Sequence, residues 1–236
     1  MNVIYKFLAN IKHKLIFIRY GRVHRPDTIR SAKNYLSLMQ IIHNKEYLYR
    51  KKIANECLSK NDIDKFKGYK IINFVDCLSI NSRNSLEELK KKYQSMDWTK
   101  NLEMQQKSFL AEIDVKIDNN VENIINDLAP IVAKYIGSWP IVKSVRFWYS
   151  SNIKNTSGRS QDWHMDAEDL KQVKVLIPVE EITEDHGPMN IMPANITKIV
   201  YEILKKDKKT KFRNEKHSDI KINSILQKIG SLDDIK

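Results

Sequence analysis

The sequence predicts an α+β protein in which helices pack against a sheet or barrel. Two observations lead to this fold class. Before about residue 138 the apolar residues recur at helical spacing, whereas from Val142 the apolar segments are short, β-branched or aromatic, and separated by turns. We expect a single domain over 1–236, with a helical part over about 1–138 and a strand-rich part over about 139–236.

The first predicted helices lie between residues 29 and 96. Residues 29–53 follow a Pro-Asp-Thr helix-start signal and repeat apolar residues at helical spacing, as one long helix or two short ones. Residues 85–96 begin with a capping-box pattern, in which Ser85 and Glu88 can each satisfy a free backbone N–H of the first turn. We therefore expect a helix that starts at Ser85.

A further helix is predicted over 120–136, where the apolar residues all fall on one face. Asn120 is the expected cap and Gly137 the expected end. Pro130 is expected to kink the helix, because proline removes an internal hydrogen bond.

Strands are predicted at 142–151, 172–182 and 189–193. Turn-forming segments such as "SNIKNTSGRS" and "TEDHGP" separate them. The charged run 202–216 is interpreted as a solvated loop or helix end.

The composition, 42% hydrophobic and 30% charged, is that of a soluble globular protein. No apolar run approaches the roughly 20 residues that a bilayer span requires, and lysines interrupt the N-terminal apolar run where a secretory signal would be continuous. Cys57 and Cys77 form neither a CxxC spacing nor a disulfide-dense pattern. We expect a cytoplasmic protein with unpaired thiols and no membrane span.

The net charge of +12 is concentrated near the N-terminus. Residues 1–70 hold 16 Lys and Arg against 5 Asp and Glu, whereas residues 71–236 hold 25 against 24. Such a surface can attract nucleic acid, an anionic surface or an acidic substrate. No zinc-finger, RNP or glycine-rich phosphate-loop pattern supports nucleic-acid binding, so a solvated surface is the preferred interpretation. A non-catalytic basic binding module is the alternative function.

One short motif carries metal chemistry, a His-x-Asp formed by His164 and Asp166. On an extended strand these two side chains point the same way, so an imidazole nitrogen and a carboxylate oxygen can bind one ion. Together they form two-thirds of the 2-His-1-carboxylate triad that holds non-haem Fe(II). Strand-like flanks and Trp163 next to the motif favour a rigid, partly dry metal site.

A second His-x-Asp, His217 and Asp219, lies in a polar context. Because "RNEKHSDIKINS" is charged on its N-terminal side, a solvated helix or loop is the preferred interpretation there. His186 lies at a turn and is expected to be exposed.

The segments "QDWHMD" (161–166) and "VKVLIPVEEITEDHGPMNIMPAN" (173–195) resemble the phytanoyl-CoA dioxygenase family of Fe(II)/2-oxoglutarate-dependent oxygenases. That family carries a Trp-His-x-Asp segment, a strand, an acidic turn ending in Gly-Pro, and a short strand that ends near a Pro-Gly-Ser-His. The resemblance implies N-terminal helices that buttress a jelly-roll barrel (a double-stranded β-helix), with about 139–236 as an incomplete barrel part.

The same resemblance implies site residues. His164 and Asp166 would be the first two iron ligands, with no further catalytic residue assigned, and Gly187 and Pro188 would form a barrel hairpin turn. The segment "MPAN" would be a divergent Pro-Gly-Ser-His element, in which Ala194 and Asn195 replace Gly and Ser.

In the family a distal His and an Arg follow on later strands, the Arg binding 2-oxoglutarate. No His follows His217 and no Arg follows Arg213 in this chain, and its closing segment "LQKIGSLDDIK" resembles the lead-in to the distal-His strand. The preferred explanation is a fragment of a longer gene product. The others are a degenerate non-catalytic relative and His217 as a displaced third ligand. The last is least favoured, because its context is charged and strand-poor.

The function implied by the resemblance is hydroxylation of an unactivated C–H bond, with Fe(II) as cofactor and 2-oxoglutarate and dioxygen as co-substrates. Asp166 favours hydroxylation, because halogenating relatives carry a small residue at that position. Whether this chain is itself an active enzyme is left open. The substrate is a small organic or acyl molecule, with acyl thioesters, sugars, polyketide intermediates and other metabolites as open alternatives.

Overall fold

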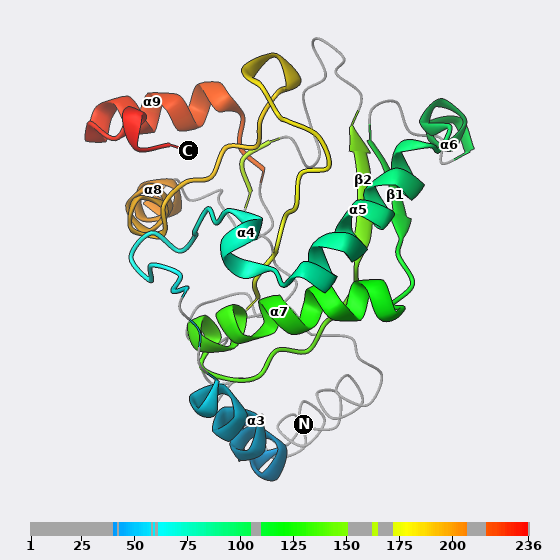
Figure 1. The fold of residues 1–236 in the computed structure, drawn as a ribbon. Coiled ribbons are helices and arrows are strands. Elements are labelled where there is room, and N and C mark those ends of the chain that lie inside the picture. Colours follow the sequence, from blue (N-terminus) through cyan, green and yellow to red (C-terminus); the bar gives the residue numbers. More distant parts are fainter. Residues whose placement is uncertain are drawn as a thin grey trace, which may run out of the picture.

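The computed structural model describes residues 40–41, 43–57, 59, 61–104, 110–150, 162–164, 172–206 and 216–235. These residues form helices and one two-stranded antiparallel sheet (Figure 1). The α-helices are α3 (Asn44–Glu56), α4 (Phe74–Cys77), α5 (Ile80–Gln94), α6 (Trp98–Met104), α7 (Asn119–Ile136), α8 (Ala194–Lys206) and α9 (Asp219–Ile229). The strands are β1 (Leu110–Asp114) and β2 (Arg146–Ser150), and two 3₁₀ turns are η2 (Glu184–His186) and η3 (Leu232–Asp234).

The centre of the fold is the pair α5 and α7, with α3 against the other side of α7 (Figure 1). Helix α7 confirms the predicted helix over 120–136, including its end at Gly137, whose φ of 71° is readily adopted only by glycine. The cap is Asp118 rather than Asn120, since the Asp118 carboxylate accepts the Val121 N–H at 3.1 Å. The helix continues through Pro130 to Ile136.

Helix α5 corrects the predicted capping box. The helix begins five residues before Ser85, and Ser79 is its cap, because the Ser79 hydroxyl accepts the Ser82 N–H at 3.2 Å. Ser85 is instead buried inside the helix and donates to Asn120 Oδ1 at 3.1 Å. Ser79 and Ser85 are each followed three residues later by a polar residue, so the local sequence allows either serine to cap the helix. The hydrogen bond from Ser79 to Asp127 on α7 favours Ser79.

Asp127 on α7 holds the start of α5. The Ser79 N–H donates to Asp127 Oδ2 at 2.7 Å. Burial raises the pKa of Asp127, but hydrogen bonds from Ser82, from the Ser79 backbone and from the Ser79 hydroxyl outweigh it, so the pKa lies below its ordinary 3.8. The carboxylate form of Asp127 therefore stabilises the folded state.

We expect Asp127→Asn to lower the free energy of unfolding by about 1 kcal/mol at neutral pH, because the charged acceptor is lost. A lowered folded-state pKa contributes stability above pH 3.8, and this contribution is lost as pH falls through the folded-state value. Urea unfolding at pH 7 and at steps below pH 3.8 should show the two proteins converging in acid. A difference that stays constant with pH would contradict this role.

The sheet pairs β1 with β2 in antiparallel register, with Ala111 opposite Tyr149 and Ile113 opposite Phe147. The rings of Phe147 and Tyr149 face the helices: Phe147 stacks on Tyr93 with centroids 4.5 Å apart, and Tyr149 stacks on Trp98 at 5.3 Å. These stacked rings form an apolar core under one face of the sheet.

The opposite face of the sheet is exposed, and there Arg146 contacts Glu112 and Asp114 at 3.1 Å each. Arg146 and Tyr149 therefore lie on opposite faces of β2, as strand alternation requires.

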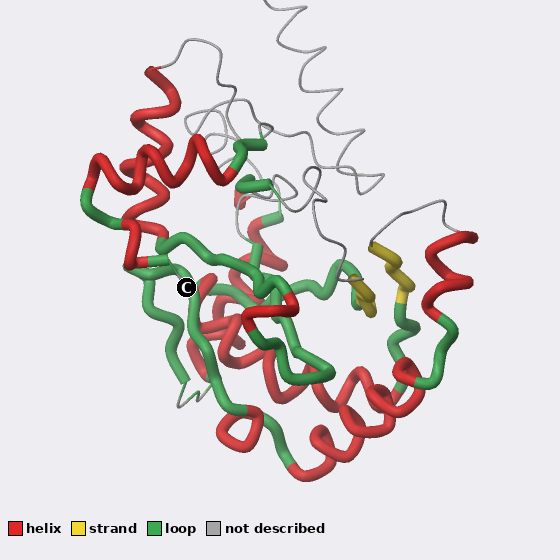
Figure 2. Tube along the Cα trace, turned by 90° about the horizontal axis from the view of Figure 1, so that it is seen from above, coloured by secondary structure: helices red, strands yellow, loops and turns green. Residues whose placement is uncertain are grey.

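The strand predicted at 142–151 is confirmed over Arg146–Ser150 as β2, with 142–145 as loop, whereas the strands predicted at 172–182 and 189–193 are wrong. Both segments are loop in the described chain (Figure 2). Their extended-strand composition needs a neighbouring strand to pair with, and the sheet of the described residues contains only β1 and β2. Ile177 instead packs against the core of Leu78, Leu86 and Ile124 between α5 and α7.

Helices α8 and α9 pack on each other around a core of their own, and the sequence pattern did not predict this helix pair. Ile196, Val200 and Leu204 on α8 face Ile222, Ile225 and Leu226 on α9. Helix α8 begins at Ala194, where the resemblance placed a strand end and a Pro-Gly-Ser-His element. The closing segment, expected as a lead-in to a strand, forms the end of α9 and η3.

Gly68 allows the loop before α4 to lie against the first turn of α8. Ala194 and Asn195 donate their N–H groups to the carbonyls of Lys67 and Phe66, at 2.7 and 3.2 Å. A Cβ on Gly68 would lie 3.0 Å from the Ala194 Cβ, and its φ of 79° also favours glycine. The segment 66–68 thus completes the N-terminus of α8.

The helix predicted over 29–53 is confirmed in its second half, where α3 runs to Glu56, while residues 29–39 lie outside the described part. Arg50 on α3 donates through Nε and Nη2 to the Trp139 carbonyl, which ties α3 to the segment after α7. None of the described helices combines the length and the apolarity needed to cross a bilayer.

Candidate metal site

The predicted ligand His164 directly follows a residue that is paired with a distant part of the chain. Its neighbour Trp163 forms an isolated antiparallel bridge with His217: the Trp163 N–H donates to the His217 carbonyl at 3.0 Å, and the His217 N–H donates to the Trp163 carbonyl at 2.9 Å. A sequence separation of 54 residues hides this pairing from any local pattern. The bridge fixes the residue directly before His164, and the strand geometry of the His-x-Asp pair stays a prediction.

The His164 ring is exposed, and its Nδ1 lies 2.6 Å from the Asp162 carbonyl oxygen. A carbonyl oxygen only accepts hydrogen bonds, so Nδ1 is the donor in this contact. Metal-binding histidines are commonly oriented in this way, with one ring nitrogen donating to a carbonyl while the other binds the metal. Nε2 is therefore the atom of His164 suited to coordination.

The second predicted ligand, Asp166, lies outside the described residues. Among the residues that the structure describes, no three His, Cys, Asp or Glu side chains are grouped so that they could hold a metal ion. The described chain thus supplies one predicted iron ligand with a suitable ring orientation. Binding of the implied iron by His164 and Asp166 stays a prediction.

The bridge brings His217 close to the His-x-Asp segment, but the His217 side chain lies on the face opposite to that of His164. Directly opposed residues of an antiparallel pair share a face and successive residues alternate, so the His217 side chain shares a face with Trp163 and not with His164. Asp219, the other half of the second His-x-Asp, begins helix α9. This motif therefore lacks the strand geometry, and His217 as the displaced third ligand is disfavoured.

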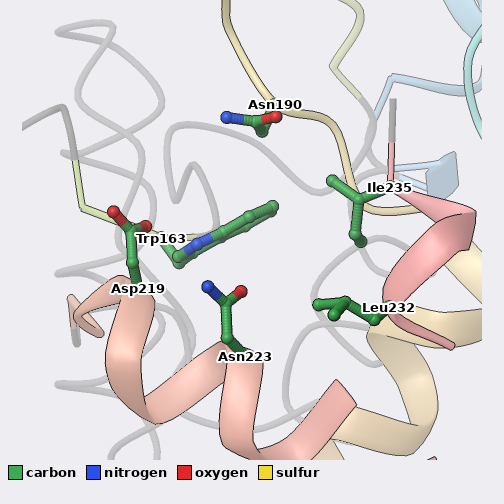
Figure 3. Close-up of a pocket in the computed structure, with 6 residues that line it drawn as sticks. All are labelled: Trp163, Asn190, Asp219, Asn223, Leu232 and Ile235. Carbon is green, nitrogen blue, oxygen red and sulfur yellow. The ribbon is translucent and has the colours of Figure 1, made fainter. Parts of the chain in front are cut away.

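Next to the bridge lies a hollow of about 260 Å³ that sequence reasoning missed (Figure 3). Trp163 forms one wall, and side chains from the loop before α8, from α9 and from η3 complete it. The described lining residues are Trp163, Asn190, Asp219, Asn223, Leu232 and Ile235. The only sequence signal was the spacing of Asp219 and Asn223, which share one helix face at i and i+4.

The turn at Gly187 and His186 is not part of the candidate metal site. Gly187 does form a turn, with φ of 66° after η2, but no strand flanks it in the described chain. His186 is exposed as predicted, and its Nδ1 accepts the Thr183 N–H at 3.1 Å. Gly187 and His186 therefore close a local turn, and no barrel hairpin is formed here.

Cys57 and Cys77 are free, as predicted, and each is half-buried. Burial, with Asp76 and Asp127 nearby, raises the pKa of the Cys77 thiol. The thiol is therefore protonated at neutral pH, which disfavours it as a nucleophile or metal ligand.

Comparison with protein-family models, with curated proteins and with solved structures gives no match. The functional assignment of this site therefore depends on its own residues.

Proposed function

We propose that this chain belongs to an Fe(II)/2-oxoglutarate-dependent dioxygenase that hydroxylates a small organic or acyl substrate with dioxygen. The observation that carries the proposal is the geometry at His164: an exposed imidazole directly after the Trp163 bridge, with Nδ1 held at 2.6 Å from the Asp162 carbonyl oxygen. The His-x-Asp spacing to Asp166 supplies the carboxylate that such a site needs.

Each residue has a limited part in the proposed reaction. His164 binds the metal through Nε2, and Asp166 supplies a carboxylate oxygen and a negative charge that favours a divalent cation. Asp162 orients the His164 ring through its carbonyl. Iron, when bound, supplies the redox chemistry that activates dioxygen and 2-oxoglutarate. The two free cysteines are consistent with a cytoplasmic location, which is part of the proposal.

The test is an anaerobic Fe(II) titration of the chain, with and without 2-oxoglutarate, followed by calorimetry and by visible absorption. We expect one Fe(II) per chain. A chain that binds no Fe(II), yet binds an anionic polymer in a salt-dependent way, would replace the oxygenase with the basic binding module.

Trp163 is proposed as a positioning residue for the metal site. Its backbone makes both hydrogen bonds of the bridge, and its side chain packs against the α8 and α9 core. These contacts hold the residue directly before His164 in place. A rigid ligand loses less conformational entropy when the metal binds.

We expect Trp163→Ala to weaken Fe(II) binding by about 10- to 100-fold, the range found when groups that orient a metal ligand are removed. Trp163→Phe should recover much of the affinity, because a ring still anchors the segment. Fe(II) titration of both variants, alongside urea unfolding, separates the two roles of Trp163. If the alanine variant unfolds more easily but binds Fe(II) like the parent, Trp163 is only a core residue.

A further inference from the structure

We propose that the hollow beside Trp163 binds a small neutral ring that carries several hydroxyl groups, the chemistry of a monosaccharide or a cyclic polyol. The hollow is formed where the segment before His164 meets α9 and η3. Binding there does not depend on the metal. Only its role as the substrate subsite rests on the proposed oxygenase function.

The lining combines an aromatic wall with polar groups that face it. In the view of Figure 3 the indole of Trp163 lies between the amides of Asn190 and Asn223, with Leu232 and Ile235 beyond the ring. An indole packs well on a ring that presents C–H groups, whereas a primary amide offers both a donor and an acceptor to hydroxyl groups. A hydroxylated ring has both kinds of surface.

The two amides are available for a ligand. Within the described part of the chain, the side chains of Asn190 and Asn223 make no hydrogen bond to the protein, and both residues are exposed. A purely apolar ligand would cover these groups without replacing the hydrogen bonds they make with water, which is unfavourable. The lining therefore selects against hydrocarbon rings and acyl chains.

Charge selects against anions. Asp219 is the one charged residue among the described lining residues, and none of them is Lys, Arg or His. A phosphate or carboxylate would lie near the Asp219 carboxylate, with no basic residue among the described lining residues to pair with, which is repulsive. Neutral ligands are therefore favoured over anionic ones in a chain whose net charge is +12.

The volume of the hollow narrows the class of ligand further. The hollow of about 260 Å³ is smaller than the roughly 300–1,000 Å³ of sites for drug-sized ligands. A single ring fits this volume, whereas a coenzyme A thioester does not. Of the substrate classes left open by the sequence, the hollow thus favours small polyhydroxylated molecules over acyl thioesters.

The experiment is saturation-transfer-difference NMR on the whole chain with a chelator present. The directly observed probes are D-glucose, myo-inositol and cyclohexanol. Inorganic phosphate, which has no carbon-bound proton, is added as a competitor, and its binding is read from the loss of the polyol signal. We expect glucose or myo-inositol to bind, and to bind more tightly than cyclohexanol or phosphate. Equal or tighter binding of cyclohexanol or phosphate would overturn the proposal, as would no binding of either polyol.

The variant Asn190→Ala/Asn223→Ala should weaken polyol binding by about tenfold, because two neutral hydrogen bonds are lost. Asn84→Ala is the matched control, since Asn84 is also exposed but lies on α5, away from the hollow. Polyol binding by the double variant that equals the parent would place the ligand elsewhere. Circular dichroism checks folding, and the single variant Asn190→Ala, outside any helix, serves if the double variant does not fold.

Failure of this inference is distinguishable from failure of the proposed function. His164→Ala should leave polyol binding unchanged in chelator while it removes Fe(II) binding. Polyol binding without Fe(II) binding would reject the oxygenase and keep the hollow as a ligand site. Fe(II) binding without polyol binding would reject the hollow as a ligand site and keep the oxygenase proposal.

Discussion

Replacing His164 by alanine is expected to weaken Fe(II) binding by about 100-fold or more, since a direct ligand matters at least as much as the groups that orient it. The ring is exposed and lies outside the buried cores, so the variant should fold like the parent. Anaerobic calorimetry of the two proteins measures the change directly.

His43 provides the matched control for His164. It is also an exposed histidine, and it precedes α3 without making a side-chain cap bond. His43→Ala should bind Fe(II) like the parent. If both histidine variants lose metal to the same extent, the binding is non-specific surface binding and the proposed site is wrong.

Leu226→Ala is expected to lower the free energy of unfolding of the α8 and α9 unit by about 2–5 kcal/mol. Leu226 is 0% exposed and lies in the core that α8 and α9 share, so its loss leaves a cavity. The same core supports Trp163, and the bridge partner His217 lies just before α9. Loss of this support should therefore weaken Fe(II) binding as well.

Ile220, on the same helix but 84% exposed, is the control for Leu226. Ile220→Ala should change the unfolding free energy by no more than about 0.5 kcal/mol. Urea unfolding, with hydrogen exchange of the α8 and α9 amides, compares the two variants locally. Similar exchange rates in Leu226→Ala and in the parent would show that this core does not hold the unit together.

The elements that the sequence predicted well are those whose boundaries depend on local chemistry. Helix α7 has an apolar face and a terminal glycine, and both features act within a few residues of one another. Strand β2 was recognised from its aromatic and β-branched composition. The start of α5 was predicted wrongly, because two serines offer similar local caps and Asp127, 48 residues from Ser79, favours the first of them.

The strands predicted at 172–182 and 189–193 failed for a related reason. A helix satisfies its backbone hydrogen bonds internally, whereas a strand needs a partner that sequence patterns do not provide. In the described chain these segments cross the molecule as loops and Ile177 joins a helical core. The jelly-roll barrel therefore stays a prediction.

The sequence by itself determined the helix α7 with its glycine end, the strand β2 and the position of the basic charge, and it predicts His164 and Asp166 as metal ligands. Only the tertiary structure decided which segments lie next to His164: the bridge from Trp163 to His217, and the hollow closed by α9 and η3. The physical reason is range. Spacing and capping act over a few residues, whereas pairing and burial depend on contacts between segments that the chain brings together from far apart.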